Sequence, residues 1–311
     1  MNKVIIMVGI SGSGKSYKTD YLKNKYNAIV LSSDELRKTL YGDETDQTHN
    51  EEVFGTLYKN LRDLLTQGKN VIVDATNITI KSRRKIIEEI KRTKINTEII
   101  AYVMTKPIEI CIKNDRIRKR HVGKEVIYAQ REKFQIPFYE EGIDKIILEN
   151  YSKREETTQE KLNTLIAGIE GFDQQNSHHK YDLLTHCSKT FQLLEDVNAD
   201  PCVQMAASLH DIGKMETKKL KDNGEYGYYG HANVGAYQLL DELKLGSTIP
   251  NAFQKTLEIL FYVNYHMLPM NWNEEKTHDK YKQLFGKTKY DNLMLLHHCD
   301  KIASGITLNT K

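Results

Sequence analysis

No arginine follows Arg154 in this 311-residue chain, although the net charge is close to balanced at +3. Up to residue 170 the chain has 30 Lys and Arg against 25 Asp and Glu, and after it 15 against 17. Arginine binds phosphate oxygens in a bidentate way, so this imbalance predicts that phosphate binding is concentrated in the first part. Drift in composition is the alternative, and charge alone does not demonstrate nucleic-acid binding.

The chain also lacks a long apolar run, a paired-cysteine motif, an internal repeat and a low-complexity segment. The opening "MNKVIIMVGI" is too short to span a bilayer and is broken by Gly9 and Gly12, which favours a buried strand over a signal peptide. None of the cysteines forms a CxxC pair, which fits a reducing compartment: Cys111, Cys187, Cys202 and Cys299. We therefore expect a cytoplasmic, intracellular protein without a membrane partner; a phage origin is compatible with this.

The length favours two domains, and the first part reads as alternating strands and helices. Apolar, β-branched runs predict strands at 3–10, 28–33, 70–76 and 97–104, and apolar spacing predicts helices at 50–68 and 81–92, with another from Lys15. This alternation predicts an α/β P-loop kinase domain with a parallel sheet and flanking helices over residues 1–170, closed by a helix at 151–171.

Strand patterns vanish after the polar stretch at 171–180, where we place the domain boundary. Helical spacing of apolar residues continues through five segments, at 182–197, 201–215, 231–243, 251–266 and 290–305. The second domain, residues 171–311, is therefore predicted to be all-α.

The segment "GISGSGKS" fits GxxxxGK[ST] between a predicted strand and a predicted helix. Its glycines let backbone N–H groups turn toward a phosphate, and the helix N-terminus adds partial positive charge. Lys15 can reach the β- and γ-phosphates, and the Ser16 hydroxyl can bind Mg²⁺. The sequence thus predicts that ATP or another nucleoside triphosphate, with Mg²⁺, binds at Gly9, Ser11, Gly12, Ser13, Gly14, Lys15 and Ser16; a ligand-free glycine turn is the alternative.

Asp34 and Arg37 stand three residues apart in "SSDELRKTL", so they share one face of the helix that follows the second strand. An aspartate near the γ-phosphate can accept the proton of an attacking hydroxyl, and an adjacent arginine can hold an anionic acceptor or orient the carboxylate. The competing interpretation is an acid that only favours the helix dipole and forms a salt bridge.

The strand end "VIVDATN" places Asp74 where a second carboxylate can assist Mg²⁺ or anchor Arg37, and Thr76 and Asn77 can position substrate. Further on, "NDRIRKRHVGKEV" carries Arg116, Arg118 and Arg120. Such a segment can close over a P-loop as a lid and place guanidinium charge on the transferred phosphate. A solvated basic face is the alternative.

With "GISGSGKS", "SSDELR", "VDATN" and an arginine-rich lid in that order, residues 1–150 resemble the kinase module of the phage-type polynucleotide 5′-kinase family. The resemblance implies that Asp34 is the general base and Arg37 an acceptor-phosphate ligand. Asp74 matches less closely, because "DATN" is one residue longer than the shorter form of that element. The lid arginines do not match one to one; we favour Arg116 and Arg120. Small-molecule kinases and toxin kinases share these motifs, so the acceptor stays open.

The dipeptide His210-Asp211 in "SLHDIGKM" offers two adjacent metal ligands in the helical domain. Other helices supply His186, His231, His266 and Asp300. Six N/O ligands without cysteine suit one or two divalent transition metals, Mn, Fe, Co or Ni, better than a closed structural zinc site. Two ions bridged by Asp211 would activate water and hold a phosphate, whose charge Lys214 can neutralise. Any one of these histidines alone is more often a packed or surface residue.

The ordered set H…HD…H…H…D over about residues 172–305 resembles the HD superfamily of metal-dependent phosphohydrolases, especially the HD domain attached to bacterial tRNA nucleotidyltransferases. The resemblance implies phosphatase, nucleotidase or 2′,3′-cyclic phosphodiesterase chemistry. Tyr181 stands where some relatives carry a histidine, which leaves His178, His179, His297 and His298 as spare candidates.

Together the two resemblances predict a bifunctional end-healing enzyme that phosphorylates 5′-OH ends and removes 3′-phosphate or 2′,3′-cyclic phosphate. Its partners would be RNA or DNA ends and a nucleoside triphosphate, with a ligase acting downstream. Two alternatives stay open: a small-molecule or nucleoside kinase fused to an HD nucleotidase, and a nucleotide-gated switch whose metal site binds without turnover.

Overall fold

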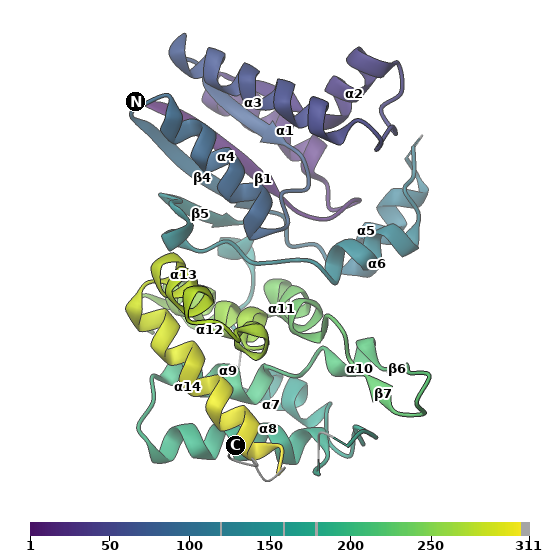
Figure 1. Cartoon of the computed structure of the whole chain (residues 1–311), viewed down its shortest axis with the longest axis vertical. Helices are drawn as coiled ribbons and strands as arrows, with labels where there is room; N and C mark the ends of the chain where they lie inside the picture. The colour runs from purple at the N-terminus through teal and green to yellow at the C-terminus, as the bar shows by residue number, and fades with distance from the viewer. Residues whose placement is uncertain (119, 158, 178–179, 306–311) are drawn as a thin grey trace. The chain divides into compact units, whose positions relative to one another are not determined.

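The computed structural model describes residues 1–118, 120–157, 159–177 and 180–305 (Figure 1). Two compact units are formed: Met1–Gln130 with Pro137–Tyr151, and Arg131–Ile136 with Ser152–Lys311. The second unit thus begins before residue 171 and includes a short segment whose neighbours in sequence belong to the first.

The first unit is a five-stranded, all-parallel sheet in the order β2-β3-β1-β4-β5. Its strands are β1 (Asn2–Val8), β2 (Ala28–Ser32), β3 (Asn70–Asp74), β4 (Thr97–Val103) and β5 (Lys145–Leu148). Its helices are α1 (Lys15–Tyr26), α2 (Ser33–Tyr41), α3 (Asn50–Thr66), α4 (Ile80–Arg92), α5 (Ile108–Arg116) and α6 (Lys124–Arg131), with short 3-10 turns η1 (Tyr139–Glu141) and η2 (Tyr151–Lys153). The predicted α/β fold with a parallel sheet and flanking helices is confirmed.

Alternating apolar residues in β1 bury both faces of the sheet. Ile5 and Met7 pack with Leu22 of α1 in one buried cluster, while α3 and α4 bury their own apolar stripes, including Leu57 and Ile86. The chain runs from β1 to β2 on one side of β1, and from β3 to β4 on the other side, so the strand order reverses next to β1. The loop after β1 therefore lies at the carboxyl edge of the sheet, where these connections diverge. Ligands of open α/β sheets bind at such an edge.

The second unit is mainly helical. Its helices are α7 (Gln159–Ala167), α8 (Leu183–Asp196), α9 (Pro201–Leu209), α10 (Lys214–Thr217), α11 (His231–Glu242), α12 (Ala252–Tyr265), α13 (Glu275–Phe285) and α14 (Lys287–Ala303), with a 3-10 turn η3 (Leu268–Asn271). Side chains of Asp182 and Asp200 cap α8 and α9, and Pro201 occupies the first turn of α9. These capping residues therefore begin both helices where the apolar spacing predicts them.

One local expectation is wrong. A single closing helix at 151–171 does not form, because the chain at Thr157 instead exchanges hydrogen bonds with Lys244, which leaves only α7 helical. The predicted helical second unit is confirmed, and it carries one short hairpin in which β6 (Lys219–Leu220) pairs with β7 (Tyr226–Gly227). The short strand β5 was not predicted, because four residues carry too little periodicity.

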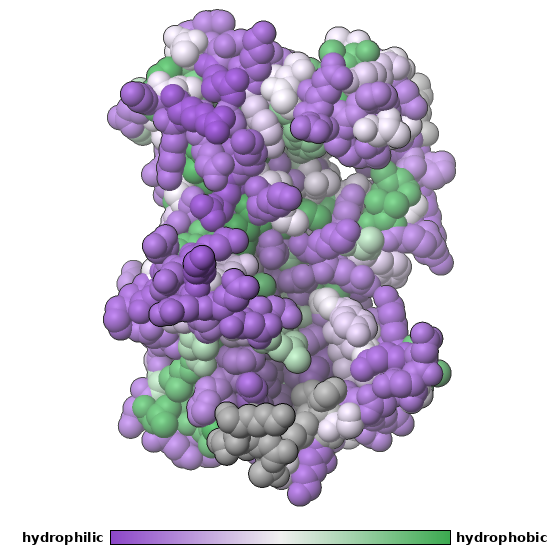
Figure 2. Space-filling view, viewed as in Figure 1, coloured by the Kyte–Doolittle hydropathy of each residue, from purple (hydrophilic) through white to green (hydrophobic). Residues whose placement is uncertain are grey.

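None of the helices in the described part of the chain is long and apolar enough to cross a membrane. On the face drawn in Figure 2, hydrophilic residues predominate and hydrophobic ones form scattered groups.

A buried ion pair fixes α4 to η1. Arg83 donates from Nε and one terminal nitrogen to the two carboxylate oxygens of Glu141, at 2.9 and 2.6 Å, with both side chains fully buried. We expect Glu141→Ala to lower the free energy of unfolding by ~3–5 kcal/mol, because it leaves the guanidinium buried without its counterion. Urea unfolding measures this loss.

The matched control is Arg92→Ala, which removes an exposed partner of Glu89 on the same α4. The Arg92 side chain is 61% exposed, and buried Glu89 keeps Arg62 and Lys85 as partners, so this loss should stay below ~1 kcal/mol. Equal losses for the two variants would contradict a structural role of the buried Arg83–Glu141 pair.

Candidate functional site

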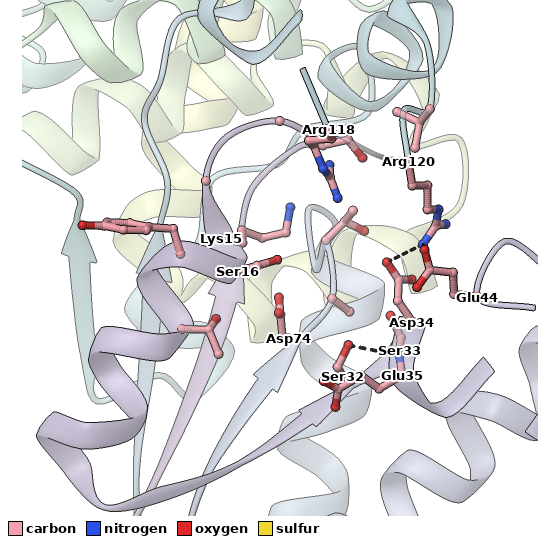
Figure 3. A pocket seen from close by; sticks show the side chains of 18 of the residues that line it. Lys15, Ser16, Ser32, Ser33, Asp34, Glu35, Glu44, Asp74, Arg118 and Arg120 are labelled. Carbon is pink, nitrogen blue, oxygen red and sulfur yellow. Dashed lines mark hydrogen bonds and ion pairs between the residues drawn. The ribbon is translucent and has the colours of Figure 1, made fainter. Parts of the chain in front are cut away.

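The first unit has a pocket of about 1410 Å³ at the carboxyl edge of its sheet. It is lined by the loop after β1, the start of α2, the end of β3 and the segment after α5. Figure 3 shows Lys15, Ser16 and Asp74 on one side of this pocket and Asp34, Glu44 and Arg120 on the other. The predicted triphosphate motif and the predicted acid–arginine pair thus share one cavity.

The loop 9–14 has the backbone shape of a phosphate cradle. Gly12 and Gly14 have φ angles of 77° and 93°, and a Cβ at Gly12 would lie 2.1 Å from the carbonyl oxygen of Cys111. Among the described residues no side chain caps the start of α1, whose first residues line the pocket, so its first N–H groups are available to a ligand. Asn114 and Gln130, which also line the pocket, hold the loop: Asn114 donates to the Gly12 carbonyl, and the Ser11 N–H donates to Gln130.

Lys15 is folded back onto this loop. Its Nζ donates to the carbonyls of Gly9 and Ile10 at 2.8 and 2.9 Å. Burial lowers the pKa of Lys15 to about 8, against an opposing effect of Asp74. Burial likewise raises the pKa of Asp74, and Lys15 opposes that shift. Ser16 and Asp74 both line the pocket, where a hydroxyl and a carboxylate can hold Mg²⁺.

Asp34 is held by an arginine at each carboxylate oxygen. Arg37 donates to Oδ1 at 2.9 Å and to Asn50 at 2.7 Å, while Arg120 donates to Oδ2 at 3.0 Å and lies 3.6 Å from Glu44. Arg37 is buried, whereas the Arg120 side chain is 23% exposed. Arg37 is therefore a fixed support, and Arg120 is the more accessible partner.

The arginine-rich segment after α5 places its arginines differently. Arg116 is exposed in the last turn of α5 and, of the residues that the structure describes, those lining the pocket include Arg118 and Arg120 instead. Buried Asp115 accepts the N–H groups of Val122 and Gly123 at 3.0–3.1 Å, which folds this segment back on α5. Arg118 was expected within the basic segment but was not favoured over Arg116, because the spacing does not show that the chain leaves the helix after Arg116.

The strand-end residues separate into two roles. Thr76 lines the pocket. Asn77 is instead buried at a φ of 45°, and its amide donates to the Met7 carbonyl at 2.9 Å, so it links two strand ends and does not position substrate. Sequence reasoning also missed Lys106 and Gln130 in the pocket lining, for which the sequence carries no motif.

In the second unit, six predicted ligands come together from separate helices. α8 supplies His186, α11 supplies His231, His266 directly follows α12, and α14 supplies Asp300. A helix over 201–215 was wrong: α9 ends at Leu209, and a turn carries His210 and Asp211 before α10 begins at Lys214. Because the helix ends there, two adjacent side chains can both reach the same cluster.

The six side chains form two groups that share Asp211. Its Oδ2 lies 3.3 Å from Nε2 of both His186 and His210, and its Oδ1 lies 3.0 and 3.6 Å from Nε2 of His231 and His266. Asp300 joins the first group, 2.9 Å from His186. Two sets of three, His186 with His210 and Asp211, and Asp211 with His231 and His266, can each converge on one cation.

The histidines are oriented as metal ligands usually are. Nδ1 of His210, His231 and His266 each lies 2.7–2.8 Å from a backbone carbonyl of its own helix or turn. A carbonyl partner fixes the proton on Nδ1 and leaves Nε2 to the cluster. Burial also lowers the pKa of His266 to about 4, which favours its neutral, ligating form.

Lys214 lies beside the bridging carboxylate. Its Nζ is 2.6 Å from Asp211 Oδ2 and donates to Gln174 at 2.8 Å; Gln174 in turn accepts at its backbone carbonyl from the Tyr228 hydroxyl. Burial would raise the pKa of Asp211, but His210 and Lys214 hold it well below its usual range. Gln174 and Tyr228 were missed, because neither belongs to a spaced motif.

The turn that carries His210 and Asp211 packs closely against the backbone of α11. A Cβ at Gly213 would lie 2.1 Å from the His231 carbonyl oxygen, so only glycine permits this approach.

Of the spare histidines, His178 and His179 lie outside the described residues, and His297 and His298 are absent from the candidate metal groups formed by the residues that are described.

Comparison with known proteins identifies both units. Residues 4–137 match the model of the AAA domain family, and residues 183–305 match that of the HD domain. The chain therefore carries a P-loop kinase-type domain of the AAA group followed by an HD domain, an architecture of enzymes.

Two solved structures match parts of the chain. A chain of the Pnkp1/Rnl/Hen1 RNA repair complex is 26% identical over 42% of this chain and 42% of its own length, with a TM-score of 0.38. The APS kinase CysC of Mycobacterium tuberculosis is 20% identical over 48% of this chain and 89% of its own, with a TM-score of 0.36. The match to the repair-complex chain thus spans less than half of that relative. No curated protein sequence matches the chain.

The lowered pKa of Lys15 predicts a pH-dependent affinity for nucleoside triphosphates. Phosphates bind the charged ammonium, so binding raises the Lys15 pKa from about 8 and takes up a proton between about pH 8 and 10. One linked proton raises Kd roughly tenfold per pH unit above pH 8. Calorimetry at pH 8.5 in two buffers of different ionisation enthalpy measures the uptake.

Lys15→Arg is the control, since its guanidinium stays charged throughout this range. Binding by the parental protein without proton uptake, or equal uptake by both proteins, would show that Lys15 is not the linked group.

The shared position of Asp211 predicts that both metal positions depend on it. Protein purified without chelator should approach two transition-metal ions per chain, and Asp211→Ala should lose both. Asp196→Ala, which changes an exposed acid on α8, should keep them. Elemental analysis decides, and a single zinc ion retained in the Asp211 variant would refute the bridging arrangement.

Proposed function

We propose that this protein is a bifunctional nucleic-acid end-healing enzyme, a polynucleotide 5′-kinase with a 3′-phosphatase or 2′,3′-cyclic phosphodiesterase. The observation that carries the proposal is that one chain holds a phosphate cradle with an adjacent acid–arginine pair and a separate six-ligand His/Asp cluster. A 5′-kinase and a 3′-phosphohydrolase do not reverse each other, because they act on opposite ends of a break.

In the kinase reaction, Lys15 leaves the Gly9 and Ile10 carbonyls and contacts the β- and γ-phosphates of ATP. The glycine loop and the first turn of α1 donate N–H groups to the same phosphates. Ser16 and Asp74 are the residues that would hold Mg²⁺, which neutralises phosphate charge when bound. Arg118, on the pocket wall, adds a cation near the transferred group.

Asp34 is the proposed general base. The acceptor 5′-oxygen forms a bond to the γ-phosphorus, the bond from that phosphorus to the β,γ-bridging oxygen breaks, and the hydroxyl proton passes to Asp34. Both Asp34 oxygens are engaged by guanidinium groups, so one must yield to the acceptor. Arg37 is buried and also tied to Asn50, so the accessible Arg120 is the one that moves, from Asp34 to a phosphate.

In the hydrolase reaction, His186, His210 and Asp300 would hold one ion, His231 and His266 another, and Asp211 both. Such ions supply water activation and charge neutralisation at a phosphate. Lys214 lies at Asp211 with its ammonium fixed by Gln174, where it can bind a phosphate oxygen of the substrate. Mn, Fe, Co or Ni suits this nitrogen- and oxygen-rich set.

The two activities together convert 5′-OH and 3′-phosphate ends into 5′-phosphate and 3′-OH ends, the form that a ligase joins. A ligase is therefore the proposed downstream partner, and RNA or DNA ends are the substrates.

The function is tested on one oligonucleotide that carries a 5′-OH and a 3′-phosphate, with both ends followed during incubation with ATP. His210→Ala should abolish 3′-phosphate removal and leave 5′-phosphorylation nearly unchanged. Asp34→Asn should reduce 5′-phosphorylation at least about 10²-fold while keeping ATP affinity, because the base contacts the acceptor and not the nucleotide.

A parallel assay offers labelled ATP with a panel of free nucleosides and sugars. Phosphorylation of one of these, with neither oligonucleotide end altered by the parental protein, would replace the proposal with a small-molecule kinase fused to a nucleotidase.

A further inference from the structure

Residues 131–136 belong to the second unit, although the residues on both sides of them in sequence belong to the first. We refer to them as the strap. Phe134 and Ile136 are fully buried, and the Phe134 ring packs edge-on against Tyr237 of α11 at 5.2 Å. Arg131 pairs with Glu216 of α10 at 2.7 Å. The strap is therefore an integral part of the core that surrounds the metal cluster.

Two asparagine side chains bind the strap backbone to α11 and α12. Asn264 of α12 accepts the Ile136 N–H at 2.6 Å and donates to the Phe134 carbonyl at 3.1 Å. It also donates to the side-chain oxygen of Asn233 on α11 at 2.8 Å, and Asn233 donates to the Glu132 carbonyl at 2.7 Å. The buried Asn264 amide thus joins two helices and the strap in one hydrogen-bond network.

Both asparagines lie two residues from a cluster histidine. Asn233 follows His231 at the start of α11, and Asn264 precedes His266 at the end of α12. Next to Asn264, the Tyr265 hydroxyl donates to the Ile136 carbonyl at 2.6 Å. The network therefore fixes the two helix ends that bring Nε2 of His231 and His266 within 3.1 Å of each other.

We propose that Asn264 and Asn233 are positioning residues for the His231/His266 half of the metal cluster, and that the strap is the support against which they hold it. The opposite half, His186, His210 and Asp300, comes from α8, the turn after α9 and α14, and the hydrogen bonds given above for the strap network include none of these three side chains. The inference rests on the proposed two-ion site but not on the reaction that the site catalyses.

The test is Mn²⁺ binding to the full chain after metal removal, measured by calorimetry and by electron paramagnetic resonance. Asn264→Ala should weaken binding of one of the two ions up to roughly 10-fold and leave the other ion unchanged. This is the low end of the effect of losing a direct hydrogen-bond partner of a metal ligand, because Asn264 acts on His266 through the backbone of α12. ATP binding to the first unit should be unaffected. General destabilisation would instead weaken both ions.

The matched control is Asn292→Ala, which removes an amide hydrogen bond from α14 to Tyr262 of the same α12 but leaves the strap network intact. It should bind both ions as the parental protein does. If Asn264→Ala does not fold, as judged by a lost cooperative thermal transition, Asn233→Ala at a half-buried position takes its place with the same expected outcome.

Two results separate the inference from the proposed function. A parental protein that binds no Mn²⁺ overturns the two-ion site itself. Two ions bound with parental affinities by both asparagine variants, or equal losses for Asn264→Ala and Asn292→Ala, overturn the positioning role alone.

Discussion

The buried carboxylate of Asp211 is the constraint around which the second unit is arranged. Removing a carboxylate from water is costly unless partners surround it, and here two pairs of imidazoles and the Lys214 ammonium do so. The partners require helix ends from four parts of the chain to meet at one point. Three features help to bring these helix ends together: the end of α9 at Leu209, the close contact at Gly213 and the strap network.

The first unit also holds charged side chains in place, but around a pocket that a ligand can enter. Its pocket stays open to a ligand, and the charges that face it are held by backbone: helix starts, strand ends and a glycine turn. Asp34 and Lys15 are each bound to protein groups that a substrate can replace, Arg120 for Asp34 and two carbonyls for Lys15. Exchangeable partners suit a site that binds and releases a polyanion, whereas the enclosed ligands of Asp211 suit ions that stay.

Much of both sites was accessible to prediction because their chemistry follows spaced residue types. The glycine motif predicts the cradle, and the pair Asp34–Arg37 lies three apart on one helix and does form its ion pair. Prediction was weaker where the chain leaves regular structure. Arg116 and Arg118 are equivalent in a basic run, yet only Arg118 lines the pocket, because the helix ends between them. Asn77 was expected to position substrate, but its side-chain amide donates to the Met7 carbonyl at a strand end.

The sequence by itself determined the two-part architecture, the glycine-rich loop after the first strand and the residue types of the His/Asp cluster, since local periodicity and residue chemistry encode each of these. Tertiary structure alone decided which oxygen of Asp211 faces which histidines, that Arg120 reaches Asp34 from 86 residues away, and that residues 131–136 complete the second unit. These features depend on contacts between segments far apart in the chain. Such contacts form through packing of whole helices, about which the spacing of residues within one segment carries no information.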